Sequence, residues 1–182
     1  MNRWRLTLAS LAAIFLAGAV ITAMLALGLA DPIRAGAQKW SVSAPSDWPG
    51  QSLTADLEFY QAPNDLPLEF TLELVARNDG PASSAWGIQL MNANPPMTIL
   101  IDNQGYYSVS QMQPEWVEFP HLQPNQTNKL YLHVTENGQA IIRINDEIAG
   151  HDLPFFTAVG QWGIVRYRQP QLAWRDIALY YP

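Results

Sequence analysis

Short segments of alternating apolar and polar residues, separated by turn residues, run through most of this 182-residue chain. In the segment 68–77 the apolar side chains stand at even positions up to Leu74, with Glu and Thr between them. This alternation is typical of strands with one buried face. Asn137-Gly138, placed between the apolar segments 130–135 and 139–144, is a strong hairpin signal. After residue 38 no ten-residue stretch has a helical period, so the sequence predicts an all-β, two-sheet antiparallel jelly-roll sandwich of about ten to twelve strands.

The first thirty residues have a different character. Residues 1–5 carry two arginines, and residues 6–30 are apolar apart from three Ser and Thr. A helix of this length spans about 37 Å, enough for a hydrocarbon core of about 30 Å. The sequence therefore predicts a cytoplasmic flank at 1–5, one N-terminal transmembrane helix acting as a signal anchor at 6–30, and a juxtamembrane linker at 31–50. Ala35-Gly36-Ala37 also has the small-x-small form of a signal-peptidase site, so cleavage before Gln38 is the alternative.

Both alternatives place residues 38–182 on the extracytoplasmic side of the cytoplasmic membrane, because the basic flank precedes the apolar segment. That part carries seven Lys and Arg against fifteen Asp and Glu, a net charge of −8. No basic footprint for nucleic acid is present. The chain has no Cys, which excludes disulfides, Cys-ligated metal sites and thiol catalysis.

The order of several short motifs resembles a known superfamily. The motifs are Trp86-Gly-Ile-Gln-Leu, Ile99-Leu-Ile-Asp-Asn-Gln-Gly-Tyr106, Asn128-Lys-Leu-Tyr-Leu, Ile142-Arg-Ile-Asn145, Gly160-Gln-Trp-Gly-Ile164 and Trp174-Arg-Asp-Ile177. In this order the chain resembles the concanavalin A-like lectin/glucanase superfamily in its laminin-G-like form, nearest to the bacterial keto-disaccharide hydrolase-type domain. The resemblance covers about residues 52–181 and implies a β-sandwich domain over 51–182. It also implies binding of sugars or proteins on a sheet face or on rim loops, with glycosidases among the members.

Catalytic motifs are missing from the sequence. Glycosidases need two carboxylates at the scissile bond, and the Glu-x-Asp-x-x-Glu run of the glucanase branch does not occur here. Nucleophile-elbow, phosphate-loop and His-Glu-x-x-His motifs are missing as well. Asp102-Asn103 and Asn145-Asp146 have oxygens suited to calcium, but Asn and Asp are also favoured in turns. We therefore expect no enzyme activity and no cofactor.

Four residues are candidates for ligand binding. Alternation directs Leu130, Leu132 and Val134 toward the core and leaves Tyr131 and His133 pointing outward. If the hairpin strands align, Arg143 joins them in an exposed patch that would stack a sugar ring and donate hydrogen bonds. Trp162 shares a face with Ile164 and is the fourth candidate, although the pattern leaves its side open. Trp86 is expected in the core.

These observations predict a membrane-anchored, extracytoplasmic, non-catalytic recognition module that binds glycan or cell-envelope material. The alternative is an accessory structural subunit of an integral-membrane protein complex. Small residues on the N-terminal helix, such as Ala13, Ala17 and Gly18, would allow the close helix packing that such a subunit needs. A glycoside hydrolase-like enzyme is the third interpretation.

Overall fold

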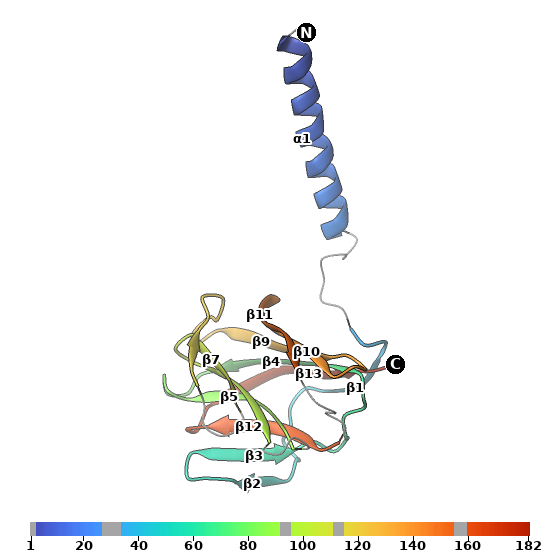
Figure 1. Ribbon diagram of the computed structural model, residues 1–182. Coiled ribbons are helices and arrows are strands. Elements are labelled where there is room, and N and C mark those ends of the chain that lie inside the picture. The colour runs from blue at the N-terminus through green and yellow to red at the C-terminus, as the bar shows by residue number, and fades with distance from the viewer. Residues whose placement is uncertain (1–2, 27–33, 92–95, 111–114, 155–159) are drawn as a thin grey trace. The chain divides into compact units, whose positions relative to one another are not determined.

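The computed structural model describes residues 3–26, 34–91, 96–110, 115–154 and 160–182. The chain divides into two units, Met1–Ile33 and Arg34–Pro182. In the first unit, α1 spans Arg3–Ala26 (Figure 1). Within the described ranges, no helix is both long enough and apolar enough to cross a membrane. The transmembrane helix predicted at 6–30 is therefore not supported: α1 ends at Ala26, and the last four residues of that prediction lie outside the described ranges.

The second unit is built from two antiparallel sheets, as the sequence predicts (Figure 1). One sheet has the strand order β1-β13-β4-β9-β10-β11, and the other β2-β3-β12-β5-β6-β7-β8. The strands of the six-stranded sheet are β1 (Gln38–Val42), β4 (Phe70–Asn78), β9 (Thr127–Val134), β10 (Gln139–Ile144), β11 (Glu147–Pro154) and β13 (Leu172–Tyr180). Those of the seven-stranded sheet are β2 (Gly50–Ser52), β3 (Leu57–Gln61), β5 (Ala85–Leu90), β6 (Met97–Asp102), β7 (Tyr106–Ser110), β8 (Val117–Glu118) and β12 (Trp162–Tyr167).

The predicted linker 31–50 contains a strand. β1 pairs with β13, where Val42 lies opposite Ile177, so this part of the linker belongs to the six-stranded sheet. The thirteen strands of the described residues exceed the expected ten to twelve chiefly because β2 and β8 are only three and two residues long. Segments of two or three residues are too short to show alternation in a sequence.

The hydrophobic core lies between the two sheets. On β4 and β9 the predicted alternation is confirmed, since Phe70, Leu72, Leu130 and Leu132 are all fully buried in it. Trp86, also buried, enters the core from the opposite sheet, as expected. Burying a large apolar side chain contributes about 1.5–3 kcal/mol, so this layer is the main source of the stability of the domain.

Close contacts between strands explain one glycine. A Cβ atom at Gly163 on β12 would meet the carbonyl oxygen of Tyr60 and the ring of Phe59 on the neighbouring strand β3. Gly163 is therefore a place where two backbones approach closely. Phe59 belongs to a second, smaller apolar cluster that also contains Ala85, Leu100 and Val165. Since Val165 alternates with the core residue Ile164, this cluster lies on the other face of the seven-stranded sheet.

Candidate functional site

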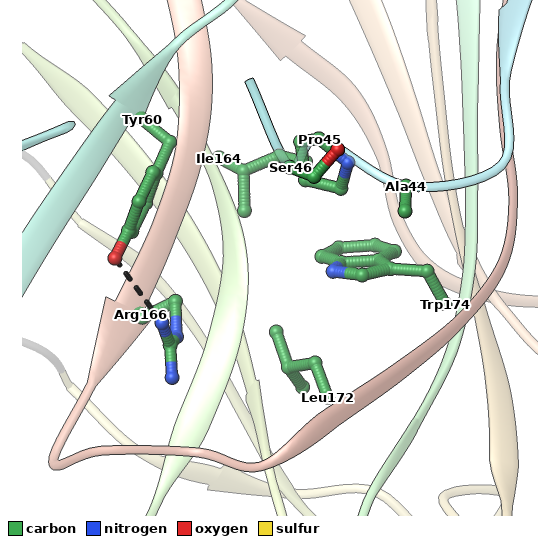
Figure 2. Close-up of a pocket in the computed structure, with 8 residues that line it drawn as sticks. All are labelled: Ala44, Pro45, Ser46, Tyr60, Ile164, Arg166, Leu172 and Trp174. Atoms are coloured by element: carbon green, nitrogen blue, oxygen red, sulfur yellow. Dashed lines mark hydrogen bonds between the residues drawn. The ribbon is translucent and has the colours of Figure 1, made fainter. Parts of the chain in front are cut away.

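A pocket of about 410 Å³ lies at one side of the sandwich, between β12 and β3 of one sheet and β13 of the other. This volume is within the range of about 300–1,000 Å³ that is usual for small-molecule sites. In Figure 2 Tyr60 and Arg166 form one side of the pocket and Trp174 the opposite side, with Pro45 and Ser46 at the top. The lining residues are Ala44, Pro45, Ser46, Tyr60, Ile164, Arg166, Leu172 and Trp174.

A β-bulge turns Trp174 into this pocket. Trp174 pairs with Ala76 of β4, but Asp176 pairs with Val75, so Arg175 is an extra residue in β13. Because of this extra residue, both the even-numbered Trp174 and the odd-numbered Ile177 pack against the core. The Trp174 indole meets the buried Trp86 edge-on, with ring centroids 5.4 Å apart. The bulge thus places a half-buried aromatic ring with one side fixed by the core and the other along the pocket.

The opposite wall carries a polar network. Arg166 is directly opposite Glu58 in the β12–β3 ladder. Its guanidinium donates to the Tyr60 hydroxyl at 3.1 Å and to the Pro170 carbonyl at 2.7 Å, and it lies 3.6 Å from Glu58 Oε2. The Tyr60 hydroxyl in turn donates to Glu58 Oε2 at 3.1 Å. The Arg166 Nε–H is buried without a partner among the described residues. This wall therefore presents a fixed cation and a hydroxyl, both of which contact the Glu58 carboxylate outside the lining.

Three tryptophans hold the segment that covers the pocket. Trp48 lies 5.7 Å from both Trp40 and Trp162, measured between ring centroids. The backbone N–H of Trp48 donates to the Pro45 carbonyl at 3.4 Å, closing a turn that includes Ser46. The packing of Trp48 therefore fixes the segment 44–46 over the pocket.

Trp162, a predicted ligand-binding residue, is fully buried in this cluster. Its indole N–H donates to the Asn64 carbonyl at 2.8 Å. The face that the sequence left open is thus the core face, and Trp162 supports the pocket from behind without lining it.

The other three predicted residues share a face, as expected. Arg143 lies opposite Tyr131 in the β9–β10 ladder, and His133 is two residues further along β9. Tyr131 and His133 point away from the core, but both are buried, so the expected exposed patch is not present. Arg143 is half-buried and donates to the Asp146 carbonyl at 2.8 Å.

Residues 34–36, which we call the N-terminal strap, pack on this face. The Ala35 N–H donates to Thr71 Oγ1 at 2.9 Å, and Thr71 Oγ1 is 2.9 Å from His133 Nδ1. Arg34 donates to Glu73, which is opposite Tyr131 in the β4–β9 ladder. The sequence does not reveal the strap, since the strap is neither strand nor helix.

Burial changes the acid–base properties of this face. It raises the pKa of Tyr131 to about 12 by disfavouring the charged phenolate. Burial also lowers the pKa of His133, only partly opposed by the nearby Glu69 carboxylate and the Phe70 carbonyl. The hydrogen bond to Glu73 raises the pKa of Arg34. The face is a closed polar layer and offers little surface to a ligand.

In the two turns considered for calcium, side-chain oxygens accept hydrogen bonds from other groups of the protein. Asp102 Oδ1 accepts from the backbone N–H groups of Gln104 and Tyr106, at 2.9 and 2.8 Å. Asn145 Oδ1 accepts from the Lys129 N–H, and Asp146 Oδ1 from the Lys129 ammonium. Among the described residues, no group of three or more His, Cys, Asp and Glu is arranged to hold a metal ion.

The pocket residues Trp174, Tyr60 and Arg166 were not predicted as a site. One signal was available in the spacing around Trp174. Large apolar residues stand at 172, 174, 177 and 179, a pattern that changes parity across the adjacent Arg175-Asp176. Such a change of parity indicates a bulge, which often re-aims a side chain.

Solved structures with a similar fold include a galectin and two domains that are named for carbohydrate binding or recognition. Sheep galectin-11, in complex with glycerol, shares 14% identity over 70% of this chain and 99% of its own, with a TM-score of 0.48. The carbohydrate-binding module CBM66 from Bacillus subtilis shares 14% identity over 81% of this chain and 93% of its own, with a TM-score of 0.48. The carbohydrate recognition domain of Emp46p, in its metal-free form, shares 9% identity over 68% of this chain and 77% of its own, with a TM-score of 0.51. No protein-family model and no curated protein matches the sequence.

The strand order and the likeness to the Emp46p domain show that the second unit, Arg34–Pro182, has a β-sandwich fold of the concanavalin A-like jelly-roll type. The fold that the resemblance in sequence implies is confirmed. At these identities the likeness shows the fold alone. The finer resemblance, to the keto-disaccharide hydrolase-type domain, stays a prediction.

Proposed function

We propose that this protein is a non-catalytic glycan-binding module whose ligand occupies the pocket between β12, β3 and β13. The observation that carries the proposal is the bulge in β13, which sets the Trp174 indole across the pocket from the Tyr60–Arg166 network. A pyranose ring has an apolar face that stacks on an indole, and hydroxyl groups that need donors and acceptors beside it.

The polar wall fits sugar hydroxyls. The Arg166 guanidinium donates, and the hydroxyls of Tyr60 and Ser46 both donate and accept. Glu58 balances the charge of Arg166 from behind, at 3.6 Å. The pocket is therefore suited to a neutral polar ring rather than to a strongly charged ligand.

The composition of the lining favours binding without hydrolysis. None of the eight described lining residues carries a carboxylate or an imidazole. Glycoside hydrolysis in most families requires two carboxyl groups on either side of the scissile bond. The similarity in fold to carbohydrate recognition domains is consistent with binding, which we propose here for this chain.

We also propose that residues 38–182 act outside the cytoplasm. A basic flank followed by an apolar segment is typical of an export signal, with or without cleavage before Gln38. Alkaline phosphatase fused to the C-terminus, which is active only after export, tests this point. An inactive but intact fusion would contradict it.

The binding proposal is tested by a glycan array probed with the full-length protein, followed by calorimetry with the bound glycan. Trp174→Ala is expected to weaken binding at least about tenfold, which corresponds to about 1.4 kcal/mol. Arg175→Ala is the matched control, because Arg175 is the exposed neighbour of Trp174 and does not line the pocket. No bound glycan on the array, or unchanged affinity of a folded Trp174→Ala variant, would overturn the proposal.

A further inference from the structure

A second, smaller pocket lies at the end of β12, where it meets the turn between β6 and β7. Its volume is about 260 Å³. Asp102 and Tyr106 contribute from the β6–β7 turn, Trp116 from the segment before β8, and Tyr167 and Arg168 from the end of β12. Segments far apart in the sequence therefore converge here, and none of these residues lines the first pocket.

The aromatic side chains of this pocket form a platform that is open to solvent. Trp116 is 37% exposed, and its ring centroid lies 6.3 Å from that of Tyr167. The Arg168 guanidinium carbon lies 5.0 Å from the centre of the Tyr167 ring, which is within cation–π distance. Tyr106 is half-buried at the same pocket. Exposed and half-buried rings that gather around a hollow provide the stacking surface that a sugar ring needs.

Polar groups at the rim are held in place by the backbone. Two backbone N–H groups fix the Asp102 carboxylate through its Oδ1 atom. The backbone N–H of Arg168 donates to the backbone carbonyl of Asp56 at 2.8 Å, and this hydrogen bond anchors the turn that follows β12. The Arg168 guanidinium lies 3.7 Å from the Asp56 carboxylate, and both side chains are about half exposed, so this ion pair is weak and exchangeable.

The charges at the platform indicate the class of ligand. One carboxylate, Asp102, and one guanidinium, Arg168, border the pocket. A carboxylate accepts and a guanidinium donates, so together they match the hydroxyls of a neutral sugar without an excess of either charge. Arg166 of the first pocket and Tyr167 of the second are consecutive residues of β12, so their side chains point to opposite faces of the sheet.

We infer that the Trp116–Tyr167 platform is a second site for a neutral pyranose ring, on the opposite face of β12 from the first pocket. The kind of ligand in this inference rests on the proposed function, whereas the location of the site is argued independently of it. Two weak sites on one domain strengthen attachment to a polymeric glycan by raising the effective concentration of the second ring once the first has bound.

In the test, Trp174 reports on binding at the first pocket and Trp116 on binding at the second. The full-length protein is labelled with 5-fluorotryptophan, and the seven ¹⁹F resonances are observed during titration with cellohexaose, maltohexaose and chitohexaose. Trp116→Phe and Trp174→Phe assign the two resonances of interest. We expect the Trp116 resonance to shift saturably with at least one of the three probes at up to about 10 mM, in the range of weak single-ring binding.

Variants separate the two sites. In Trp174→Ala the Trp116 shift should persist with an affinity within about threefold of wild type, while in Arg168→Gln it should weaken at least about fivefold. A Trp116 resonance that does not move with any probe, or whose shift disappears in Trp174→Ala, overturns the second site. A Trp174 resonance that does not move while Trp116 does would count against the first pocket and leave the second site standing.

Discussion

Arg34 donates hydrogen bonds to both carboxylate oxygens of Glu73, at 2.8 and 3.3 Å, from a position 39 residues earlier in the chain. The Glu73 side chain is only 8% exposed, whereas that of Arg34 is 46% exposed. The guanidinium also lies 4.9 Å from the centre of the Tyr180 ring. The N-terminal strap is therefore fastened to the six-stranded sheet by an ion pair whose acidic member is buried.

Replacing Arg34 with Ala should lower the free energy of unfolding by about 1–3 kcal/mol, because it leaves the buried Glu73 carboxylate without its charged donor. The measurement is urea denaturation of the full-length protein at neutral pH. Arg77→Ala is the matched control, since Arg77 pairs with Asp79 at the surface and both side chains are nearly half exposed. A surface pair of this kind contributes about 0–1 kcal/mol, so equal losses for the two variants would contradict a buried role for Glu73.

The burial of His133 predicts that stability falls in mild acid. Burial lowers the pKa of His133 in the folded state, while in the unfolded chain it should be near about 6.5. As the pH falls through that value the unfolded state takes up the proton first, so the free energy of unfolding decreases until the folded-state pKa is reached. The slope should not exceed about 1.4 kcal/mol per pH unit.

Denaturant unfolding measured between about pH 7.5 and 5 checks this slope. In His133→Asn the slope should become flatter, whatever the absolute stability of the variant. His121→Gln serves as the control because His121 is exposed, and it should leave the slope as in wild type. A wild-type slope retained in His133→Asn would show that other groups cause it.

Gly163→Ala should be one of the most damaging single-methyl changes in the domain. The added Cβ would meet a backbone carbonyl within a paired strand, which cannot rotate away, so we expect a loss of about 3 kcal/mol or more. Gly105→Ala is the comparison, because nothing lies within 4 Å of its Cβ position and only its φ of +99° opposes the change. That backbone strain should cost about 1–2 kcal/mol. Thermal melts of the two variants should therefore rank Gly163→Ala well below Gly105→Ala.

Trp48→Ala should weaken glycan binding at the first pocket although Trp48 does not line it. Loss of its ring contacts with Trp40 and Trp162 would release the segment 44–46 that covers the pocket. We expect an affinity loss of about tenfold, measured by calorimetry with the glycan selected on the array. Phe119→Ala is the control. Phe119 is also half-buried and ring-paired, with Tyr107 at 5.7 Å, so it should lower stability and leave the affinity unchanged.

Much of the sandwich could be predicted from the sequence because its strands follow simple alternation. The face assignments on β4 and β9 were correct, and so was the alignment of Tyr131 with Arg143. Alternation reports the direction of a side chain relative to the sheet and not what lies over it. Tyr131 and His133 point outward as predicted, yet they are buried, because the strap packs over that face through contacts that are distant in the sequence.

The first pocket was missed for a related physical reason. Its walls come from two sheets, and the residue that completes it, Trp174, depends on one extra residue in β13. Strict alternation continued from Ile177 back through β13 would have turned Trp174 away from the core. The side of Trp162 was ambiguous because the apolar Ile164 and the charged Arg166 lie on the same face of β12. The structure shows that this face is in the core at Trp162 and reaches the pocket at Arg166.

The strap also bears on the timing of any cleavage before Gln38. In the folded domain Ala35 is buried, and the strand β1 begins at Gln38. Folding thus ties down Ala35 on one side of the bond and Gln38 on the other, which makes this segment a poorer protease site than the same segment in the unfolded chain. Folding of the domain should therefore slow cleavage at this point, whereas a chain that is cleaved first folds without the strap. The ratio of chains that start at Gln38 to intact chains would then depend on how fast the domain folds during the proposed export, and a lower ratio would indicate faster folding.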